Sequence, residues 1–357
     1  MTDFIHQFSE KLIYWYSDNY RELPWRNTNN PYYIWLSEII LQQTRVEQGL
    51  PYFEKFVRLF PNISDLSKAP EDEVLKAWEG LGYYSRARNL HYTAKYIDQE
   101  LAGVFPNQHD EIIKLKGVGP YTAAAIASFA FKEKVPAIDG NVYRVLSRIF
   151  EIDDPIDTNA GKKQFKLISE ELISKQQPDV YNQAMMELGA TICLPKKPNC
   201  IQCLFHGNCG SSKQEKWKKR PIKSKKLVKR HRYFDYFVLQ YNEHVYIKKR
   251  GDKDIWKGLY EFYLIESQTQ NLQHSIADTL LNNSEIDLYI DALYSQNEWN
   301  YQQDLTHQKL HINLHVVILK DEPQLGNQFI KAKKEQLTDY AFPKTLGIFI
   351  NDSFSYL

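Results

Sequence analysis

All four cysteines of this 357-residue chain lie between Cys193 and Cys209, with Cys200 and Cys203 between them. A disulfide framework usually spreads its cysteines along a secreted chain. Met1–Glu10 shows neither the basic start nor the apolar run of a signal peptide. Clustered thiols in a chain without a secretion signal favour a metal site. This segment is therefore expected to fold around a bound metal group.

That group is either an iron–sulfur cluster or zinc. Four thiolates within 17 residues suit a 4Fe–4S cluster. Zinc also binds four cysteines, but zinc ribbons usually show two Cys-x2-Cys knuckles, and here only Cys200 and Cys203 form one. The spacing thus favours a 4Fe–4S cluster as the cofactor. The first loop of this segment also carries Lys196 and Lys197, which can present positive charge to a phosphate.

The sequence predicts two domains joined by a basic linker. Residues 1–212 have the periodicity of helices separated by short Pro- or Gly-containing loops, which is typical of a compact all-α domain. Residues 213–231 form the linker, and residues 232–357 alternate apolar and polar side chains, which indicates an α+β domain. The predicted helices are Ile5–Tyr16, Ile34–Thr44, Glu71–Trp78, Ala87–Glu100, Asp110–Leu115, Tyr121–Phe131, Val142–Ile149, Lys163–Ser174, Val180–Ala190 and His274–Leu281, and the predicted strands are Tyr233–Tyr241, His244–Lys249, Leu259–Ile265 and Leu310–Ile318.

The linker concentrates positive charge in a chain whose net charge is only +1. Between Lys213 and Arg232, eleven Lys or Arg residues stand against a single acid, Glu215. We predict that this stretch contacts DNA phosphates; the alternative is a solvated tether. No segment approaches the ~20 continuous apolar residues of a membrane helix. We therefore expect no membrane partner, and a cytoplasmic monomer.

Gly117, Val118 and Gly119 form a turn between two predicted helices. Glycines permit positive φ and the close approach of a ligand. The free amides at the start of the next helix, near Pro120, favour a phosphate. The pattern indicates a helix–hairpin–helix element, which grips one DNA strand through its backbone. An ordinary tight turn between helices is the alternative.

Two carboxyl groups are candidates for acid–base chemistry. Glu38 is the single charge in an apolar helical run. If it faces a pocket, desolvation raises its pKa and lets it act as a general acid; otherwise it lies exposed on the polar face. Gln42, four residues later, would share that face and could bond to a base edge. Asp139 precedes a predicted helix and is expected to be its N-cap. Close to the hairpin, it could also stabilise a developing cation.

Taken in order, these segments resemble the helix–hairpin–helix superfamily of DNA glycosylases. The cysteine spacing is the one that endonuclease III and the adenine glycosylase family share. The resemblance covers roughly residues 1–210 and implies an all-α glycosylase domain with an iron–sulfur cluster loop. Leu-Pro-Trp-Arg at 23–26, Ser-Glu-Ile-Ile-Leu-Gln-Gln-Thr at 37–44 and Gly-Leu-Gly-Tyr-Tyr-Ser-Arg-Ala-Arg at 80–88 are similar to the adenine-removing branch.

Tyr121 separates the two branches of that superfamily. In the endonuclease III branch, the equivalent position is a lysine that forms a Schiff base and cuts the strand. A phenol cannot form an imine with a sugar aldehyde. The resemblance therefore implies a monofunctional hydrolase that removes adenine paired with 8-oxoguanine or guanine in duplex DNA, during base excision repair. The alternatives are an endonuclease III-like bifunctional glycosylase and AP lyase, and a DNA-binding module without activity.

The resemblance also assigns roles to single residues. Glu38 would protonate adenine at N7, Asp139 would stabilise the oxocarbenium-like sugar, and Tyr121 would hold the sugar and the acid. Asn141 would be a polar neighbour of Asp139. Protonation makes adenine a neutral leaving group, and the paired carboxyls follow the logic of retaining glycosidases. The expected DNA contacts are Arg26, Gln43, Leu81, Tyr83, Gly117, Val118, Gly119, Lys196 and Lys197. For Leu81 and Tyr83, core packing is the alternative.

The C-terminal domain resembles the Nudix-like domain of the same family. Residues 256–262 match its Trp-x-Gly-Leu-x-Glu-Phe pattern, but the acidic box that would hold magnesium is missing. The resemblance implies a recognition module, in which Thr306 and His307 contact 8-oxoguanine and Leu305 stands in place of the family's Phe. His307, His311 and His315 would share one polar face, which we interpret as a solvated sheet face rather than a metal site.

Overall fold

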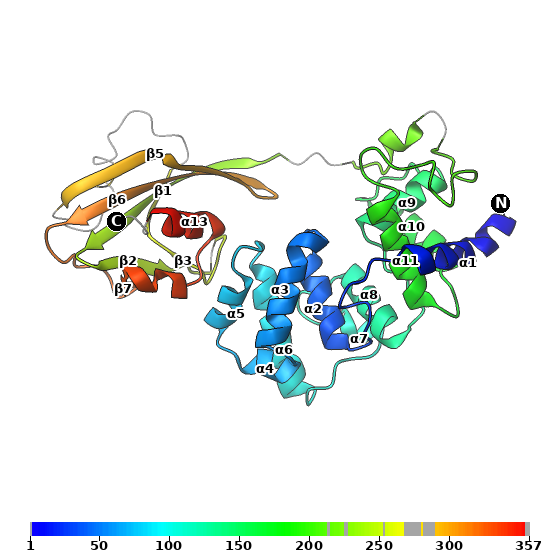
Figure 1. Cartoon of the computed structure of the whole chain (residues 1–357), viewed down its shortest axis with the longest axis horizontal. Coiled ribbons are helices and arrows are strands. Elements are labelled where there is room, and N and C mark those ends of the chain that lie inside the picture. The colour runs from blue at the N-terminus through cyan, green and yellow to red at the C-terminus, as the bar shows by residue number, and fades with distance from the viewer. Residues whose placement is uncertain are drawn as a thin grey trace. The chain divides into compact units, whose positions relative to one another are not determined.

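The computed structural model describes residues 2–212, 215–224, 228–252, 254–267, 280 and 290–353 (Figure 1). The chain divides into two compact units. The first unit is formed by Met1–Lys68 and Asn89–Lys226, and the second by Ala69–Arg88 and Leu227–Leu357. Ala69–Arg88 therefore groups with the C-terminal part of the chain, a division that differs from the predicted domain limits. No helix of the described residues is long and apolar enough to cross a membrane.

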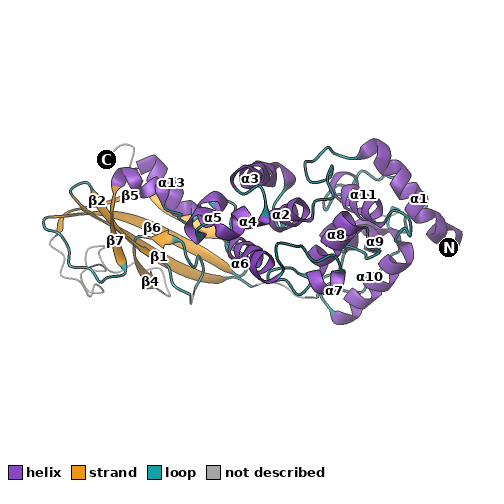
Figure 2. Ribbon diagram, turned by 90° about the horizontal axis from the view of Figure 1, so that it is seen from below, coloured by secondary structure: helices purple, strands orange, loops and turns teal. Residues whose placement is uncertain are grey.

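The first unit is helical, and Figure 2 shows the strands only in the C-terminal part of the chain. Most predicted helices are present to within a few residues. The helices over Val46–Leu59 and Ile63–Lys68 were not predicted. The first contains Gly49 and Pro51, which favour a turn, and the second is only six residues long. The helices up to residue 219 are α1 (Thr2–Asn19), α2 (Pro31–Leu41), α3 (Val46–Leu59), α4 (Ile63–Lys68), α5 (Glu71–Trp78), α6 (Ser85–Glu100), α7 (His109–Ile112), α8 (Pro120–Phe131), α9 (Gly140–Ile149), α10 (Asn159–Leu172), α11 (Pro178–Thr191) and the 3-10 helix η1 (Lys216–Lys219).

The segment that carries the cysteines is part of the core of this unit. Phe205, which lies between Cys203 and Cys209, is fully buried and stacks on Phe8 of α1 with 4.3 Å between ring centroids. Phe165 of α10 belongs to the same apolar cluster. The cysteine segment is thus held in place by packing as well as by any group that its thiols bind.

The second unit contains one mixed sheet of the described strands, in the order β3-β2-β1-β6-β5. β1 pairs in parallel with β6 and antiparallel with β2 and β4, while β7 pairs with β2. A C-terminal helix, α13, packs its Leu346 and Phe349 into the sheet's core. The bounds are β1 (Arg230–Tyr241), β2 (His244–Lys249), β3 (Tyr260–Glu261), β4 (Tyr263–Ser267), β5 (Ile290–Asp304), β6 (Gln308–Leu319), β7 (Phe329–Lys333), the 3-10 helix η2 (Lys334–Asp339) and α13 (Lys344–Ser353).

Several predictions for this unit need correction. The single strand predicted over Leu259–Ile265 is two strands, because the chain breaks from the sheet at the buried Phe262. β5 was not predicted, since register shifts between Ser295 and Asn300 interrupt its alternation. β7 and α13 were also not predicted. The helix expected over His274–Leu281 lies outside the described residues except for Leu280, which is buried.

The predicted solvated histidine face is wrong for His315. That side chain is 2% exposed, and its Nε2 lies 3.4 Å from Asp235 Oδ1. His311 instead pairs with His231, with 3.0 Å between His311 Nε2 and His231 Nδ1. The predicted face is therefore divided between a buried ring and a partly exposed one.

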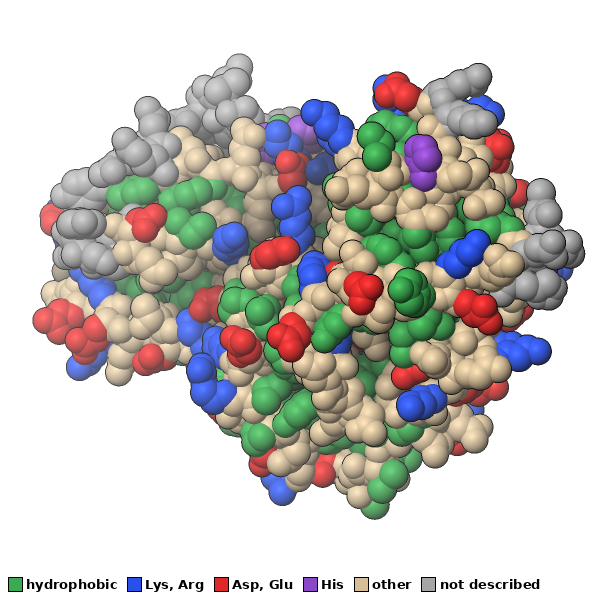
Figure 3. Space-filling model, turned by 45° about the vertical axis from the view of Figure 1, so that its right-hand side comes forward, with side chains coloured by type: hydrophobic (Ala, Val, Ile, Leu, Met, Phe, Trp, Pro, Cys, Tyr) green, Lys and Arg blue, Asp and Glu red, His purple; other side chains and the backbone are tan. Residues whose placement is uncertain are grey.

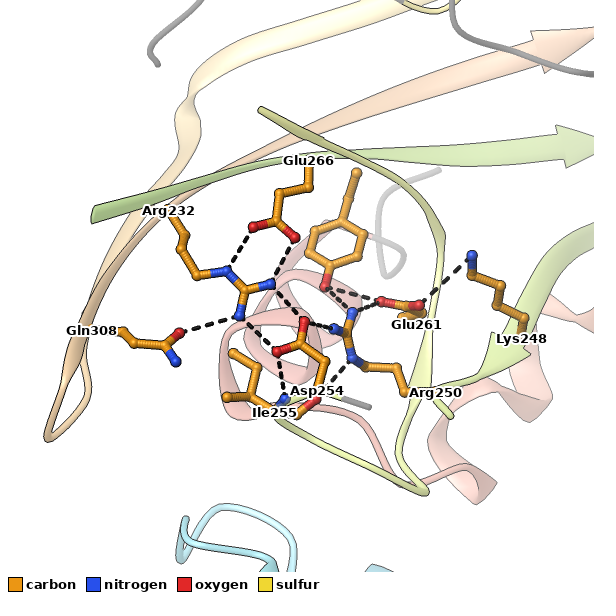
Figure 4. Close-up of polar contacts among 9 residues, drawn as sticks. Arg232, Lys248, Arg250, Asp254, Ile255, Glu261, Glu266 and Gln308 are labelled. Carbon is orange, nitrogen blue, oxygen red and sulfur yellow. Dashed lines mark hydrogen bonds and ion pairs between the residues drawn. The ribbon is translucent and has the colours of Figure 1, made fainter. Parts of the chain in front are cut away.

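An ion-pair network joins the start of β1 to β3, β4 and the loop after β2 (Figure 4). Arg232 pairs with both Asp254 and Glu266, and Asp254 also accepts from Arg250. Arg250 in turn pairs with Glu261, and the side chains of that pair are each 6% exposed. A buried ion pair is costly to break, because truncating one partner leaves the other charge unpaired in a dry environment.

Arg250→Met is expected to destabilise the protein by about 3 kcal/mol in urea unfolding, because buried Glu261 loses its closest cation and keeps only Lys248, at 3.8 Å, as a charged partner. The double variant Arg250→Met/Glu261→Gln should recover most of that loss. Lys331→Met is the matched control, since the Lys331–Glu322 pair has side chains 39% and 52% exposed. It should change stability by less than about 0.5 kcal/mol. Equal effects of Arg250→Met and Lys331→Met would contradict the importance of burial.

Candidate active site

Glu38 lies on α2, surrounded by buried apolar residues, and is itself 8% exposed. The helix is well defined at its start: Pro31 is its first residue, and Asn30 Oδ1 accepts from Tyr32 N at 2.9 Å. Burial raises the pKa of the Glu38 carboxyl to about 7; a hydrogen bond with Tyr121 opposes the shift, and the charge of Asp139 adds to it. Glu38 is therefore the buried acid that the apolar run predicted, not an exposed polar residue.

The helix of Glu38 ends earlier than predicted. α2 stops at Leu41, and Gln43 adopts a left-handed backbone with φ of 57°. Gln42 is thus the C-cap rather than a helical neighbour of Glu38, and its Nε2 donates to Thr122 Oγ1 at 3.2 Å. Gln42 therefore does not lie one helical turn beyond Glu38, and that prediction is wrong, although Gln42 still lines the same cleft.

Asp139 is the N-cap of α9, as predicted. Its Oδ1 accepts from the backbone N–H groups of Asn141 and Val142, both at 2.8 Å, and its Oδ2 accepts from Asn141 Nδ2 at 2.6 Å. Burial raises the pKa of Asp139, and these N–H donors oppose the shift. All three bonds favour the ionised form. The proton available to the two carboxyls is therefore better placed on Glu38.

Both carboxyls open into one cleft of about 680 Å³ within the first unit. Tyr121, the second residue of α8, and Asn141 line it as well. The Tyr121 hydroxyl also lies 3.6 Å from Met186 Sδ. A cleft of this size, mostly apolar with a few convergent polar groups, is typical of small-molecule sites. The structure thus brings all of the predicted catalytic side chains together.

The hairpin turn leads into the uncapped start of α8, while Val118 N within the turn already donates to the Leu115 carbonyl at 3.1 Å. Gly117 has φ of +83°, and a Cβ there would lie 2.6 Å from Asn89 Cβ, so a larger residue would push the turn away from α6. Gly119 caps α8 without a side-chain acceptor. The first N–H groups of α8 can therefore donate hydrogen bonds to an anion bound at the helix's positive end. Val118 is 8% exposed and packs inward.

Arg26 is held inside the protein. It lines the cleft, but its Nη2 lies 2.6 Å from Glu187 Oε2, and Arg21 Nε pairs with the other oxygen of that carboxylate. The Glu187 side chain is fully buried. Arg26 therefore shapes the wall of the cleft and adds positive potential near Glu38 rather than extending freely into solvent. In contrast, Lys196 and Lys197 are exposed on the cysteine segment.

A chain of hydrogen bonds connects Asp139 to the cysteine segment. Asn141 Oδ1 accepts from Arg144 Nη2 at 2.7 Å, and Arg144 Nε donates to the Cys193 carbonyl at 2.7 Å. Arg144 is 9% exposed. The position of the Asp139 carboxylate therefore depends on the conformation of the loop that begins at Cys193. Neither Arg144 nor Glu187 was predicted as a site residue, although Arg144 and Arg148 stand out as cations beside the apolar stripe of α9.

The four cysteines are free thiols that line one cavity. Burial raises the pKa of Cys203 to about 11 and also raises that of Cys200 and Cys209, so their thiolates require a compensating cation. Among the residues that the structure describes, no three His, Cys, Asp or Glu side chains are close enough to hold one metal ion. A single zinc would need its sulfurs about 2.3 Å from one point, whereas a cluster spreads them over several irons.

Two of the expected DNA contacts, Gln43 and Tyr83, have an uncommon backbone. Gln43 is exposed in the first unit, and Tyr83, at φ of 50°, is 46% exposed in the second. Left-handed backbone in residues other than glycine is strained and concentrates at functional sites. Leu81 is 5% exposed and packs inward in this conformation.

Within the second unit, Tyr83 meets the turn between β5 and β6. Its hydroxyl lies 2.9 Å from Thr306 Oγ1, and the guanidinium of Arg86 lies 5.5 Å from the centre of its ring. His307 is exposed beside Thr306. The structure therefore brings together an expected DNA contact, Tyr83, and an expected base-recognition residue, Thr306, a contact that no local sequence pattern predicts.

Comparison with known families and structures agrees with these observations. Residues 36–174 match the HhH-GPD superfamily of base excision DNA repair proteins, and residues 235–351 match the NUDIX domain. A thermostable thymine-DNA glycosylase is 28% identical, with a TM-score of 0.55 over 59% of this chain and 97% of that one. An endonuclease III–DNA complex, 20% identical with a TM-score of 0.53 over 61% of this chain and 99% of that one, shares the fold.

Curated relatives extend over most of the chain. An adenine DNA glycosylase from Buchnera aphidicola subsp. Baizongia pistaciae is 40% identical over 71% of this chain and 73% of its own length. One from Buchnera aphidicola subsp. Acyrthosiphon pisum is 36% identical over 76% and 77%. The adenine DNA glycosylase of Homo sapiens is 40% identical over 57% of this chain and 39% of its own length. The chain belongs to the adenine DNA glycosylase family and is a DNA glycosylase of base excision repair.

Proposed function

We propose that the enzyme hydrolyses the N-glycosidic bond of adenine mispaired with 8-oxoguanine or guanine in duplex DNA, and does not cut the strand. The observation that carries this proposal is one cleft lined by both Glu38, whose pKa burial raises to about 7, and Asp139, whose carboxylate accepts three hydrogen bonds from Asn141 and Val142. A pair of carboxyls held in different protonation states can donate a proton and stabilise a cation in the same reaction.

The reaction begins with adenine turned out of the helix into the cleft. Glu38 donates its proton to N7 of the base, the bond from N9 to the sugar carbon breaks, and adenine leaves as a neutral molecule. The Asp139 carboxylate stabilises the positive charge that develops on the sugar. A water molecule then adds to the sugar carbon and loses a proton to the Glu38 carboxylate, which leaves an abasic site and restores the acid. Turning the base out costs a few kcal/mol, less at a mismatch.

Tyr121 supports hydrolysis without strand cleavage. The hydroxyl bonds to Glu38 and faces the cleft, where it can hold the acid and the sugar. Burial raises the pKa of Tyr121 well above its ordinary value, so the phenol stays neutral. A neutral phenol at this position offers no amine to form a Schiff base with the sugar.

The pair formed by Tyr83 and Thr306 supports recognition of the oxidised base. Two hydroxyls 2.9 Å apart can exchange donor and acceptor roles, and both belong to residues that the family resemblance places at the DNA. 8-Oxoguanine differs from guanine by an added oxygen at C8 and a proton at N7. A hydroxyl that can either donate or accept is suited to read that edge.

We propose a 4Fe–4S cluster as the cofactor of the cysteine site. Cys193, Cys200, Cys203 and Cys209 would hold it, and its role here would be structural. Their shared cavity and their need for a compensating cation support the assignment. Because Arg144 bonds to the Cys193 carbonyl and to Asn141, an ordered cysteine loop also keeps Asp139 in place.

Glu38 should set the upper pH limit of excision. The acid must be protonated, so the single-turnover rate of adenine release is expected to be highest below about pH 7 and to fall as the pH rises through the pKa of Glu38. Glu38→Gln should reduce the rate by at least about 10²-fold and abolish that upper limb. A rate that stays constant up to pH 9 in the wild type would exclude Glu38 as the acid.

Strand chemistry gives a second prediction. A duplex with adenine opposite 8-oxoguanine should release adenine, and the strand should break only after hot alkali opens the abasic site. No adduct should be trapped by borohydride, because no imine forms. Strand breaks without alkali, together with a trapped adduct, would instead favour the endonuclease III-like lyase.

Thr306→Val removes the hydroxyl and keeps the shape of the side chain. It should reduce the preference for adenine opposite 8-oxoguanine over adenine opposite guanine by about tenfold, the value of one hydrogen bond in a partly buried site. Thr306→Ser is the matched control and should retain the preference, while Tyr83→Phe should resemble Thr306→Val. The measurement is the ratio of single-turnover rates on the two duplexes. An unchanged ratio in Thr306→Val would show that the Thr306 hydroxyl takes no part in recognising 8-oxoguanine.

A further inference from the structure

Trp217 of η1 forms part of the wall of the cysteine cavity. The sequence predicted that this stretch, inside the basic linker, would either touch DNA or remain a solvated tether. The structure instead places the half-buried Trp217 ring at the same cavity as the four thiols. An indole in that position covers apolar surface and excludes water from its neighbours.

Arg148 of α9 joins the linker to the cysteine loop. It is 3% exposed, and its guanidinium lies 5.5 Å from the centre of the Trp217 ring. On one side it donates to Cys193 Sγ at 3.4 Å and to the Leu194 carbonyl at 2.7 Å. On the other side it donates to the Arg220 carbonyl at 3.3 Å. One cation therefore holds a sulfur ligand, its loop and the linker together.

Acidic residues after α9 anchor the linker. Arg220, with a side chain 9% exposed, pairs with Asp153 at 2.9 Å and with Glu151 at 3.5 Å, and Lys216 pairs with Glu151 at 3.2 Å. Gly210 makes room for this contact, because a Cβ there would lie 2.4 Å from Glu151 Cγ.

The linker stays attached beyond these ion pairs. Ile156 N donates to the Ile222 carbonyl at 3.0 Å, and Ser224 N donates to Asp157 Oδ1 at 2.9 Å. Backbone bonds of this kind define one path for the chain, so residues 216–224 are an ordered part of the first unit rather than a free tether, although several of their side chains are exposed. Lys216 and Arg220 are also already paired with acids, which reduces the charge that the linker can offer to DNA.

We propose that residues 216–224, here called the linker wall, are the outer wall of the metal site and that Trp217 shields the bound group from oxidants and chelators. This inference rests on the proposed 4Fe–4S cofactor. The apolar shell around a metal group controls the access of solvent to it. Because Arg148 contacts both sides, the bound group and the docked linker wall also stabilise each other.

The test compares the loss of iron from full-length proteins. Wild type, Trp217→Ala, Trp217→Phe and Arg220→Met are purified without oxygen, and their iron and sulfide contents are measured. Each is then mixed with ferricyanide and an iron chelator, and the release of iron is followed by absorbance. Trp217→Ala should lose iron at least several-fold faster than wild type, and Trp217→Phe should be close to wild type. Arg220→Met should also lose iron faster, since it frees the linker wall without changing the cavity lining.

Lys219→Ala is the matched control, because Lys219 is an exposed residue of the same 3-10 helix. It should lose iron at the wild-type rate. Trypsin gives a second readout: it should cut between Lys216 and Lys223 faster after the iron has been removed. Wild type without iron and sulfide would overturn the proposed cofactor. A different result would contradict only the proposed role of the linker wall. In that case wild type and Trp217→Ala would both contain iron and release it equally fast, and trypsin would cut each protein at the same rate before and after iron removal.

Discussion

The catalytic half of this protein depends on one buried carboxyl group. Glu38 lies on a helix whose neighbouring side chains are apolar and buried, and desolvation there raises its pKa to about 7. An ionised carboxylate in such surroundings is costly, so the group retains its proton near neutral pH. The hydroxyl of Tyr121 and the nearby negative charge of Asp139 complete its environment. The cleft is thus a place where proton donation is favoured before any DNA binds.

The helix α9 connects the parts of the site. Asp139 caps its start, Arg144 links Asn141 to the Cys193 carbonyl, and Arg148 reaches both the cysteine loop and the linker wall. One helix therefore contacts three parts of the proposed machinery that are separate in the sequence: the capping carboxylate of Asp139, the cysteine loop and the linker wall. The path from the Cys193 carbonyl to the Asp139 carboxylate consists of three successive hydrogen bonds, through Arg144 and Asn141.

Some of the linker's basic side chains are already paired with acids of the same unit. Acidic and basic side chains are interspersed over the face drawn in Figure 3. Within the linker, Lys216 and Arg220 form ion pairs with Glu151 and Asp153. The uncapped start of α8 and the exposed Lys196 and Lys197 offer further groups of the first unit that can bind phosphate.

The sequence predicted those features that depend on local pattern. The periodicity of apolar residues located most helices, and the single charge in an apolar run identified Glu38 as a buried acid. The position of Asp139 directly before a helix correctly predicted that it is an N-cap. Features that depend on distant contacts were missed. The ion pairs that fix Arg26 and Arg220 join residues far apart in the sequence, and nothing local distinguishes a paired arginine from a free one. The contact between Tyr83 and Thr306 spans more than two hundred residues. The end of α2 before Gln42 follows from a left-handed Gln43, a conformation that no sequence pattern marked.

The most direct test of the central claim is a carbon NMR titration of glutamate carboxyl groups in the free protein, with the Glu38 signal assigned by its loss in Glu38→Gln. The Glu38 carboxyl is expected to titrate with a midpoint near pH 7, well above the exposed glutamates. A midpoint near the ordinary value of about 4.3 would show that the cleft does not hold a neutral acid, and the proposed division of roles between Glu38 and Asp139 would fail.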